Sequence, residues 1–286
     1  MKRAFVVSGM VCLLTSMPAS AAETLRRFSI VVGANAADGR PKLRYAEADA
    51  ERFAGVLMEL GGVRKSDLTS LSQPTALAVN QAVRALRTRV DEARATSGRV
   101  ETVFYYSGHA DESGLLLGSE RVSYKDLRDE LNAAQADVRI AVLDACASGA
   151  MTRLKGGSPR LPFLVDASSN MKGHAFLTSS SADEAAQESD RIRGSFFTHY
   201  LVSGLRGAAD ASGEGKVTLN EAYQYAFNET LGRTLTTQSG PQHPSYDIDL
   251  TGTGDVVITD LRETSSSLVL DADISGRCYV LSLIHI

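Results

Sequence analysis

The feature that most constrains the fold is a regular alternation of strand-like and helix-like stretches. Short apolar runs typical of buried strands cover residues 27–35, 103–110, 139–149 and 174–181. Amphipathic helices are predicted over residues 45–62, 76–95, 123–133, 195–207 and 219–234. This order predicts an α/β fold of three layers, with a mostly parallel central sheet flanked by helices.

Two of the predicted strands end on side chains that can carry chemistry. "VFYYSGHA" (103–110) ends with His109, and "RIAVLDACASG" (139–149) reaches Cys146. In open α/β sheets, catalysis takes place at the carboxyl ends of the strands. A neighbouring imidazole lowers the pKa of a thiol and can carry its proton, so the two residues predict a nucleophile and its base. The alternative is that His109 is a turn histidine and Cys146 a small core residue.

Charge and targeting signals limit the partners of the chain. Residues 1–21 have the basic start, short apolar run and small-residue cleavage site of a secretory signal peptide. Without them the chain has 28 basic and 34 acidic side chains, a net charge of −6. This balance argues against a nucleic-acid or anionic-membrane partner. We expect an exported protein, periplasmic or secreted, with no membrane anchor after signal removal.

The cysteines do not form a disulfide framework. Cys12 lies in the predicted signal, which leaves Cys146 and Cys278. Exported proteins that depend on disulfides contain more cysteines, in even number. A bridge between these two residues is the alternative to a free, reactive thiol at Cys146.

The two strand-end motifs resemble those of the caspase–metacaspase–paracaspase family of cysteine peptidases. In that family a Tyr-Ser-Gly-His-Gly strand end supplies the base and an Asp-x-Cys-x-Ser-Gly strand end supplies the nucleophile. The resemblance covers about residues 27–260. It implies a caspase-like peptidase domain over residues 24–261, followed at 262–286 by a linker and the start of a truncated C-terminal β segment.

The resemblance also implies roles for individual residues. Cys146 would attack the scissile carbonyl and His109 would protonate the leaving amine. Backbone N–H groups of Cys146 and Ala110 would hold the oxyanion. Ala110 departs from the family's glycine, which raises the question whether the backbone needs a positive φ there. Ala147 also departs from the histidine common in metacaspases.

Acidic residues of the family's specificity pocket match three positions of this sequence. They are Asp144, Asp49 and, less closely, Glu184. Carboxylates there would select substrates with Arg or Lys before the cut. For Asp49 the alternative is a solvated charge on a helix. Cleavage after basic residues further suggests self-processing in residues 150–172, at Arg153, Lys155 or Arg160.

A glycine-rich stretch at residues 210–221 partly matches a calcium-binding loop. Its candidate ligands are Asp210, Ser212, Glu214, Thr218 and Glu221, with Gly215 at the turn. Thr218 and Glu221 also form a helix capping box, which is the structural alternative. Catalysis by a Cys–His pair requires no cofactor, so calcium would be an accessory.

Two other functions remain open at this point. One is a catalytically weak or inert caspase-fold module that binds peptides or a partner protein. The other is an amidase or transpeptidase that uses the same pair on a non-protein substrate. The leading prediction is a cysteine endopeptidase that acts on protein or peptide substrates, cutting after Arg or Lys.

Overall fold

The structure is a computed structural model that describes residues 25–146, 171–181 and 184–262. The predicted signal peptide, the proposed self-processing sites Arg153, Lys155 and Arg160, and Cys278 lie outside the described residues. Nearly all of the predicted C-terminal segment, residues 262–286, also lies outside the described residues.

A six-stranded sheet forms the centre of the described part, with strand order β12-β8-β7-β3-β1-β2. Its members are β1 (Leu25–Ala34), β2 (Leu68–Ser72), β3 (Arg99–Gly108), β7 (Val138–Asp144), β8 (Lys172–Thr178) and β12 (Ser245–Thr251). Neighbouring strands run parallel, except that β12 is antiparallel to β8. The carboxyl ends of the five parallel strands therefore lie at one edge of the sheet.

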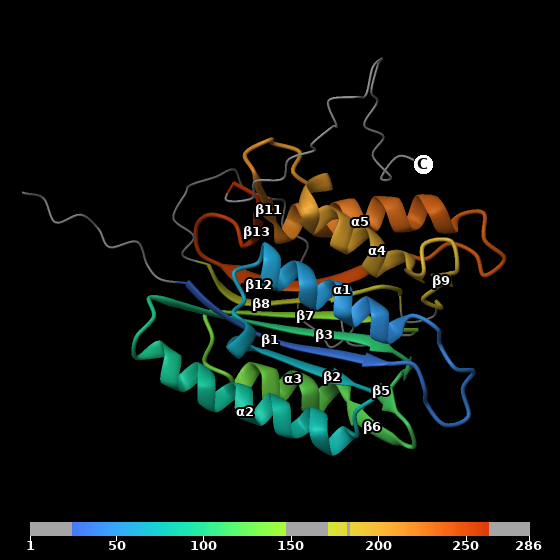
Figure 1. Ribbon diagram of the computed structural model, residues 1–286, viewed down its shortest axis with the longest axis horizontal. Coiled ribbons are helices and arrows are strands. Elements are labelled where there is room, and N and C mark those ends of the chain that lie inside the picture. Colours follow the sequence, from blue (N-terminus) through green and yellow to red (C-terminus); the bar gives the residue numbers. More distant parts are fainter. Residues whose placement is uncertain (1–24, 147–170, 182–183, 263–286) are drawn as a thin grey trace, which may run out of the picture.

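Helices cover both faces of this sheet (Figure 1). One face packs against α1 (Ala46–Glu59), α4 (Phe196–Ser203) and α5 (Leu219–Thr234), and α4 continues into a π-helical turn at Gly204–Ala208. The other face packs against α2 (Ala76–Arg94) and α3 (Tyr124–Ala133). The predicted three-layer α/β fold is confirmed.

Short strands and one 3-10 helix complete the described elements. Three strands, β4 (Ala110–Asp111), β5 (Gly114–Leu117) and β6 (Glu120–Ser123), form a small sheet directly after β3. Two more pairs are β9 (Glu188–Ser189) with β10 (Gly194–Ser195), and β11 (Lys216–Thr218) with β13 (Val257–Asp260). The 3-10 helix spans Lys65–Asp67, before β2.

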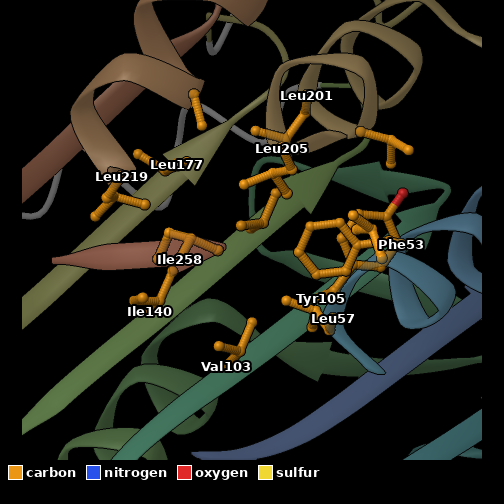
Figure 2. Packing of buried hydrophobic residues seen from close by; sticks show 14 of the residues in the cluster. Phe53, Leu57, Val103, Tyr105, Ile140, Leu177, Leu201, Leu205, Leu219 and Ile258 are labelled. Atoms are coloured by element: carbon orange, nitrogen blue, oxygen red, sulfur yellow. The ribbon is translucent and has the colours of Figure 1, made fainter. Parts of the chain in front are cut away.

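The two-sided core explains the continuous apolar runs of the central strands. Along β3, Val103 and Tyr105 face α1 and α4, whereas Phe104 and Tyr106 face α2 and α3. The Tyr105 ring stacks on Phe53 of α1 with a centroid distance of 4.3 Å (Figure 2). Strands buried on both faces need apolar residues at every position rather than at alternate ones.

Side-chain caps mark where four of the five described α-helices begin, α1 being the exception. The side chains of Thr75, Ser123, Ser195 and Thr218 each accept a backbone N–H bond at a helix start. At Thr218 the bond is part of a capping box with Glu221, and α5 has the bounds that the sequence predicts. Within the described residues, none of the helices has the length and apolar character needed to cross a membrane.

Candidate active site

The register between β3 and β7 places the two motif residues at the same edge. Ser107 pairs with Asp144 at the carboxyl ends of these parallel neighbours. His109 and Cys146 each follow two residues later. The expectation that the two motif strands are neighbours in the sheet is therefore confirmed.

His109 is held by backbone groups on two sides. Its Nε2 lies 2.8 Å from the carbonyl oxygen of Pro41. Because a carbonyl can only accept, this contact requires the proton on Nε2 and leaves Nδ1 as an acceptor. The single O–H of Tyr106 is shared between the His109 carbonyl, at 2.6 Å, and the Leu116 carbonyl, at 2.9 Å. Tyr106 thus fixes the backbone that carries the imidazole.

The close approach of neighbouring groups to Gly108 explains why a glycine precedes His109. A Cβ on Gly108 would meet the Tyr106 hydroxyl and would lie 2.9 Å from the carbonyl oxygen of Ala34. Any larger residue would push the Tyr106 hydroxyl away from the His109 carbonyl. Gly108 therefore serves the position of His109 rather than the conformation of its own backbone.

Ala110 does not need the conformational freedom of glycine. It belongs to β4 and pairs with Leu115 of β5. The described non-glycine residues with positive φ are Gln73 and Arg193, so Ala110 is not among them. The departure from the family's glycine is accommodated without backbone strain at this position.

The Cys146 thiol is half-buried and free. Its Sγ lies 3.8 Å from the carbonyl oxygen of Ala186, to which it donates. Burial raises the pKa of this thiol. Among the contacts of the described residues there is no hydrogen bond between Sγ and His109, so the thiol is not paired with its expected base in this structure.

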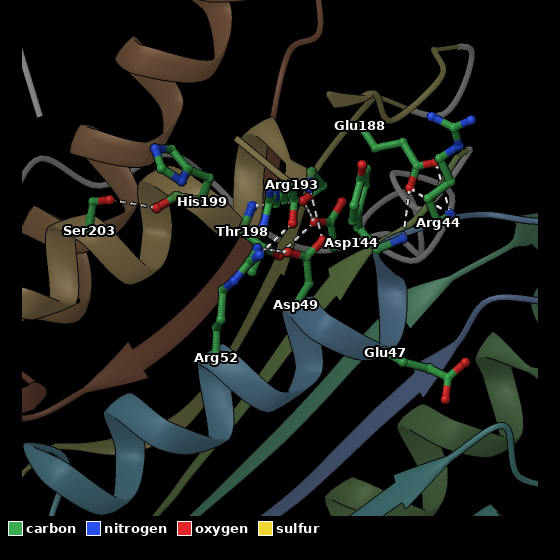
Figure 3. Close-up of polar contacts among 12 residues, drawn as sticks. Arg44, Glu47, Asp49, Arg52, Asp144, Glu188, Arg193, Thr198, His199 and Ser203 are labelled. Carbon is green, nitrogen blue, oxygen red and sulfur yellow. Dashed lines mark hydrogen bonds and ion pairs between the residues drawn. The ribbon is translucent and has the colours of Figure 1, made fainter. Parts of the chain in front are cut away.

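Two acidic residues lie buried at the same edge of the sheet. Asp144 is 3% exposed and Asp49, on α1, is 1% exposed. The backbone N–H of Ser195 donates to Asp49 Oδ2 at 2.8 Å, and its hydroxyl donates to Asp144 Oδ2 (Figure 3). The Thr198 hydroxyl donates to the same oxygen of Asp144 at 2.6 Å. The start of α4 therefore joins the two carboxylates, and Asp49 is not a solvated helix charge.

The charges of this acidic pair are only partly compensated. Asp49 Oδ1 has one cation, Arg52, at 2.9 Å, and the other nitrogen of that guanidinium bonds the Arg193 carbonyl. Asp144 Oδ1 is buried without a hydrogen-bond partner among the described residues. Burial raises the pKa of Asp144, and burial together with the Asp144 charge raises the pKa of Asp49 to about 8.

The amino-acid sequence contains signals for some of these site residues. Asp49 follows Ala46 by three residues and precedes Phe53 by four, so helical spacing places it on the buried stripe of its helix. Ser195 stands at the helix start that its sequence predicts. Nothing in the sequence indicates the carbonyls of Pro41 and Ala186, because every residue has such a group.

Glu184 pairs with His243 instead of the acidic pair. Its two oxygens accept from the His243 backbone N–H and ring Nδ1, each at 2.7 Å. Burial raises the pKa of Glu184, but the bonds from His243 lower it by more, so the net shift is downward. A contact between Glu184 and a substrate stays a prediction.

Two of the three acidic side chains of the candidate calcium loop accept hydrogen bonds from within the loop and the helix start that follows it. Asp210 accepts backbone N–H groups of Gly213, Glu214 and Gly215. Glu221 accepts from the backbone and hydroxyl of Thr218, each at 2.9 Å. In the described part of the chain, no group of three or more His, Cys, Asp or Glu side chains is arranged to hold a metal ion. Calcium binding by this loop stays a prediction.

The chain forms an α/β domain in which helices cover both faces of the central sheet. A thiol, an imidazole and a buried acidic pair lie at the carboxyl ends of its parallel strands. The family model of the caspase domain of C14 peptidases matches residues 26–253. The chain therefore belongs to the caspase-like cysteine peptidase family. A search of curated proteins found no significant match.

A solved structure shows the same fold. The crystal structure of caspase-1 from Spodoptera frugiperda has 14% sequence identity to this chain, with a TM-score of 0.58. The similarity covers 84% of this chain and 94% of that one. It confirms the caspase fold expected from the two motifs, with a mainly parallel sheet between helical layers.

Proposed function

We propose that the chain is a cysteine endopeptidase that cuts after Arg or Lys, with Cys146 as nucleophile and His109 as acid and base. One observation carries the proposal. Two neighbouring parallel strands end with these residues at a single edge, and a buried acidic pair lies at that same edge. Membership of the caspase-like family supports proteins or peptides as the substrates.

The contacts of His109 suit the proton transfers of this mechanism. With Nε2–H held by Pro41, Nδ1 is free to take the thiol proton. The Cys146 thiolate then attacks the carbonyl carbon, and the N–H groups of Cys146 and Ala110 donate to the oxyanion. The imidazolium passes its proton to the departing amine, and the Pro41 carbonyl stabilises its positive charge until then. Water hydrolyses the thioester and regenerates the thiol.

The acidic pair supports selection of a basic side chain. Asp144 Oδ1 lacks a partner, and an arriving guanidinium or ammonium would supply one. A cation also removes the repulsion that raises the pKa of Asp49. Arg has the advantage over Lys of forming two parallel bonds to carboxylates. An Asp side chain would be repelled.

A second candidate function is a caspase-fold module that binds peptides without turnover. The raised thiol pKa and the Cys146 bond to Ala186 favour it, because neither prepares a thiolate. Under the peptidase proposal, substrate binding displaces the weak 3.8 Å contact and brings the thiol to His109.

The deciding experiment is cleavage of a peptide library with products read by mass spectrometry. The peptidase proposal expects cuts after Arg and Lys, and loss of about 1000-fold or more in kcat/KM for Cys146→Ala and His109→Gln. His199→Gln is the matched control, since His199 belongs to α4 and has no assigned role. Binding of the same peptides by wild type without any cleavage would support the module instead. Preferential cleavage after Asp would contradict the specificity.

The proposed function also includes catalysis without a cofactor and an exported location. Peptide cleavage would need no cofactor, and calcium would act, if anywhere, through residues 210–221. Calorimetry without heat at about millimolar calcium would exclude that role. Export would remove residues 1–21, which N-terminal sequencing of the protein made with its full leader would test.

A further inference from the structure

A basic feature lies at the amino edge of the sheet, opposite the candidate active site. An open hollow of about 390 Å³ is formed at the amino ends of β7 and β8, next to the end of β12. Its floor is a row of neighbours across three strands: Arg139, His174 and Asp249. Arg94 at the end of α2 and Lys172 at the start of β8 line its sides.

The three cations of this hollow have no carboxylate partner within the described residues. Arg94 and Arg139 each donate one Nη1 bond, to the backbone carbonyls of Gln135 and Ala136 respectively. Lys172 is exposed at the first position of its strand. Arg139 also has a buried Nε without an acceptor. Burial lowers the pKa of Arg139 in spite of the opposing effect of Asp137, so a further anion would relieve the remaining cost of burying this charge.

The acidic residues of the hollow do not cancel this charge. Asp137 acts on Arg139 electrostatically without an ion pair, and its Oδ2 accepts the backbone N–H of Val100 at 2.9 Å. With Asp249 also counted and His174 neutral, three cations face two anions, a net charge of +1. This positive hollow belongs to a chain whose overall charge is negative.

The shape of the hollow is fixed by backbone. Gly173 has φ +134°, and any side chain there would meet the Asp249 carbonyl. β8 and β12 therefore approach closely at this point, and no side chain of residue 173 fills the space. The His174 ring packs against the Phe176 ring at a tilt of 35°, with a centroid distance of 4.7 Å, and this contact orients it within the row.

We propose that this hollow is a binding site for a small phosphate-bearing anion. Planar guanidinium groups match the oxygens of phosphate in pairs, and an ammonium adds a point charge. The volume admits a ligand larger than inorganic phosphate, such as a phosphorylated metabolite. The site is separate from the proposed catalytic edge and does not depend on the peptidase activity.

The test is isothermal titration with inorganic phosphate, at constant ionic strength adjusted with chloride. We expect saturable binding with a Kd of about 1 mM or tighter, weakened about tenfold by Arg139→Gln and by Lys172→Gln. Arg87→Gln, an exposed change on α2 outside the hollow, should leave Kd unchanged. A glucose phosphate titrated in parallel distinguishes a phosphorylated metabolite from free phosphate as the preferred form.

Two results would overturn the proposal. One is the absence of saturable binding by either probe up to about 20 mM. The other is equal binding by wild type and by the Arg139→Gln/Lys172→Gln double variant. Thermal unfolding of each variant without ligand shows whether it is folded, so a loss of binding cannot be mistaken for misfolding.

Discussion

The two edges of the central sheet bury acidic side chains in contrasting ways. At the amino edge, Glu101 accepts bonds from Arg27 and Arg99, with its closest contact at 2.6 Å. Asp67 likewise accepts from Arg26 and Arg89. At the carboxyl edge, Arg52 pairs with Asp49 and is the only cation among the described residues that pairs with either Asp49 or Asp144. The other partners of these two carboxylates are hydroxyl and backbone N–H groups.

This difference distinguishes carboxylates that stabilise the fold from carboxylates that are available to bind a ligand. Arginine partners lower the pKa of Asp67 despite its burial. At the other edge, burial raises the pKa of Asp144 and of Asp49. Carboxylates with a strongly raised pKa and an unpartnered oxygen are common at functional sites, where a ligand completes the site. The buried carboxylates that lack full compensation by arginine therefore lie at the carboxyl edge, whereas those at the amino edge are compensated.

The largest effect should come from breaking the amino-edge cluster. Arg27→Met leaves Glu101 with one arginine and also removes bonds to the Gly61 and Ile258 carbonyls, each 2.7 Å long. We expect a loss of about 3–5 kcal/mol in the free energy of unfolding, measured with urea. Arg84→Met breaks an exposed pair with Glu130 and should cost at most about 1 kcal/mol. Equal losses in the two variants would show that the amino-edge cluster has no special structural role.

The next effect concerns activity at the carboxyl edge. Asp144→Asn should lower kcat/KM for Arg peptides about 100-fold, equivalent to about 2.7 kcal/mol of lost transition-state binding. Its stability at pH 7 should change by less than about 1 kcal/mol, because the amide removes a buried charge of raised pKa.

The matched comparison is Glu101→Gln at the amino edge. This variant weakens a compensated cluster, so it should lose stability and keep its preference for Arg peptides. If Asp144→Asn instead lost stability without losing Arg preference, the two edges would not differ in the way described.

A smaller effect is the pH dependence of stability. Folded Asp49 keeps its proton up to a pKa of about 8, whereas in the unfolded chain it ionises near pH ~4. Between these values the folded state binds more protons, so stability falls as pH rises, by at most about 1.4 kcal/mol per pH unit. Asp67 has a lowered pKa, and its contribution is lost instead as pH falls through that value.

Denaturant unfolding at several pH values from 5 to 8 measures whether the free energy of unfolding falls as pH rises. The slope of stability against pH should be less negative in Asp49→Asn than in wild type. An unchanged slope would mean that Asp49 is ionised in the folded protein throughout this range.

The smallest effect should come from Arg52→Gln. This change removes the cation beside Asp49, which repels an incoming basic side chain. We expect KM for Arg peptides to fall about 2- to 5-fold with kcat nearly constant, and the pKa of Asp49 to rise. Arg87→Gln, an exposed change on α2, should alter neither quantity. A rise in KM would instead assign Arg52 to holding the β9–β10 hairpin through the Arg193 carbonyl.

The sequence predicts the elements of this fold because local rules determine them. Apolar runs and helical spacing locate strands β1, β3, β7 and β8 and the five helices, and the capping box locates the start of α5 at Leu219. The ends of β3 and β7 identify His109 and Cys146 as candidates. That β3 and β7 are neighbours follows from long-range pairing, which the sequence supports only through the family resemblance.

The sequence could not predict which groups complete the site. The Pro41 carbonyl lies 68 positions before His109 and has no side-chain signature. The bond between Ser195 and Asp144 spans 51 positions, and a serine at a helix start is explained by capping alone. For Glu184, the family resemblance suggests a place in the pocket, and the sequence gives no sign of the pairing with His243 that the structure shows. Such pairings depend on tertiary contacts.

The most direct test of the account is alkylation of Cys146 by two matched peptidyl ketone probes, one ending in Arg and one in Asp. The modified residue and its rate of modification are read by tandem mass spectrometry. The account predicts that the Arg probe modifies Cys146 at least about 100-fold faster than the Asp probe, and that His109→Gln slows the modification by both probes. Equal rates for the two probes, or rapid alkylation that does not depend on His109, would contradict it.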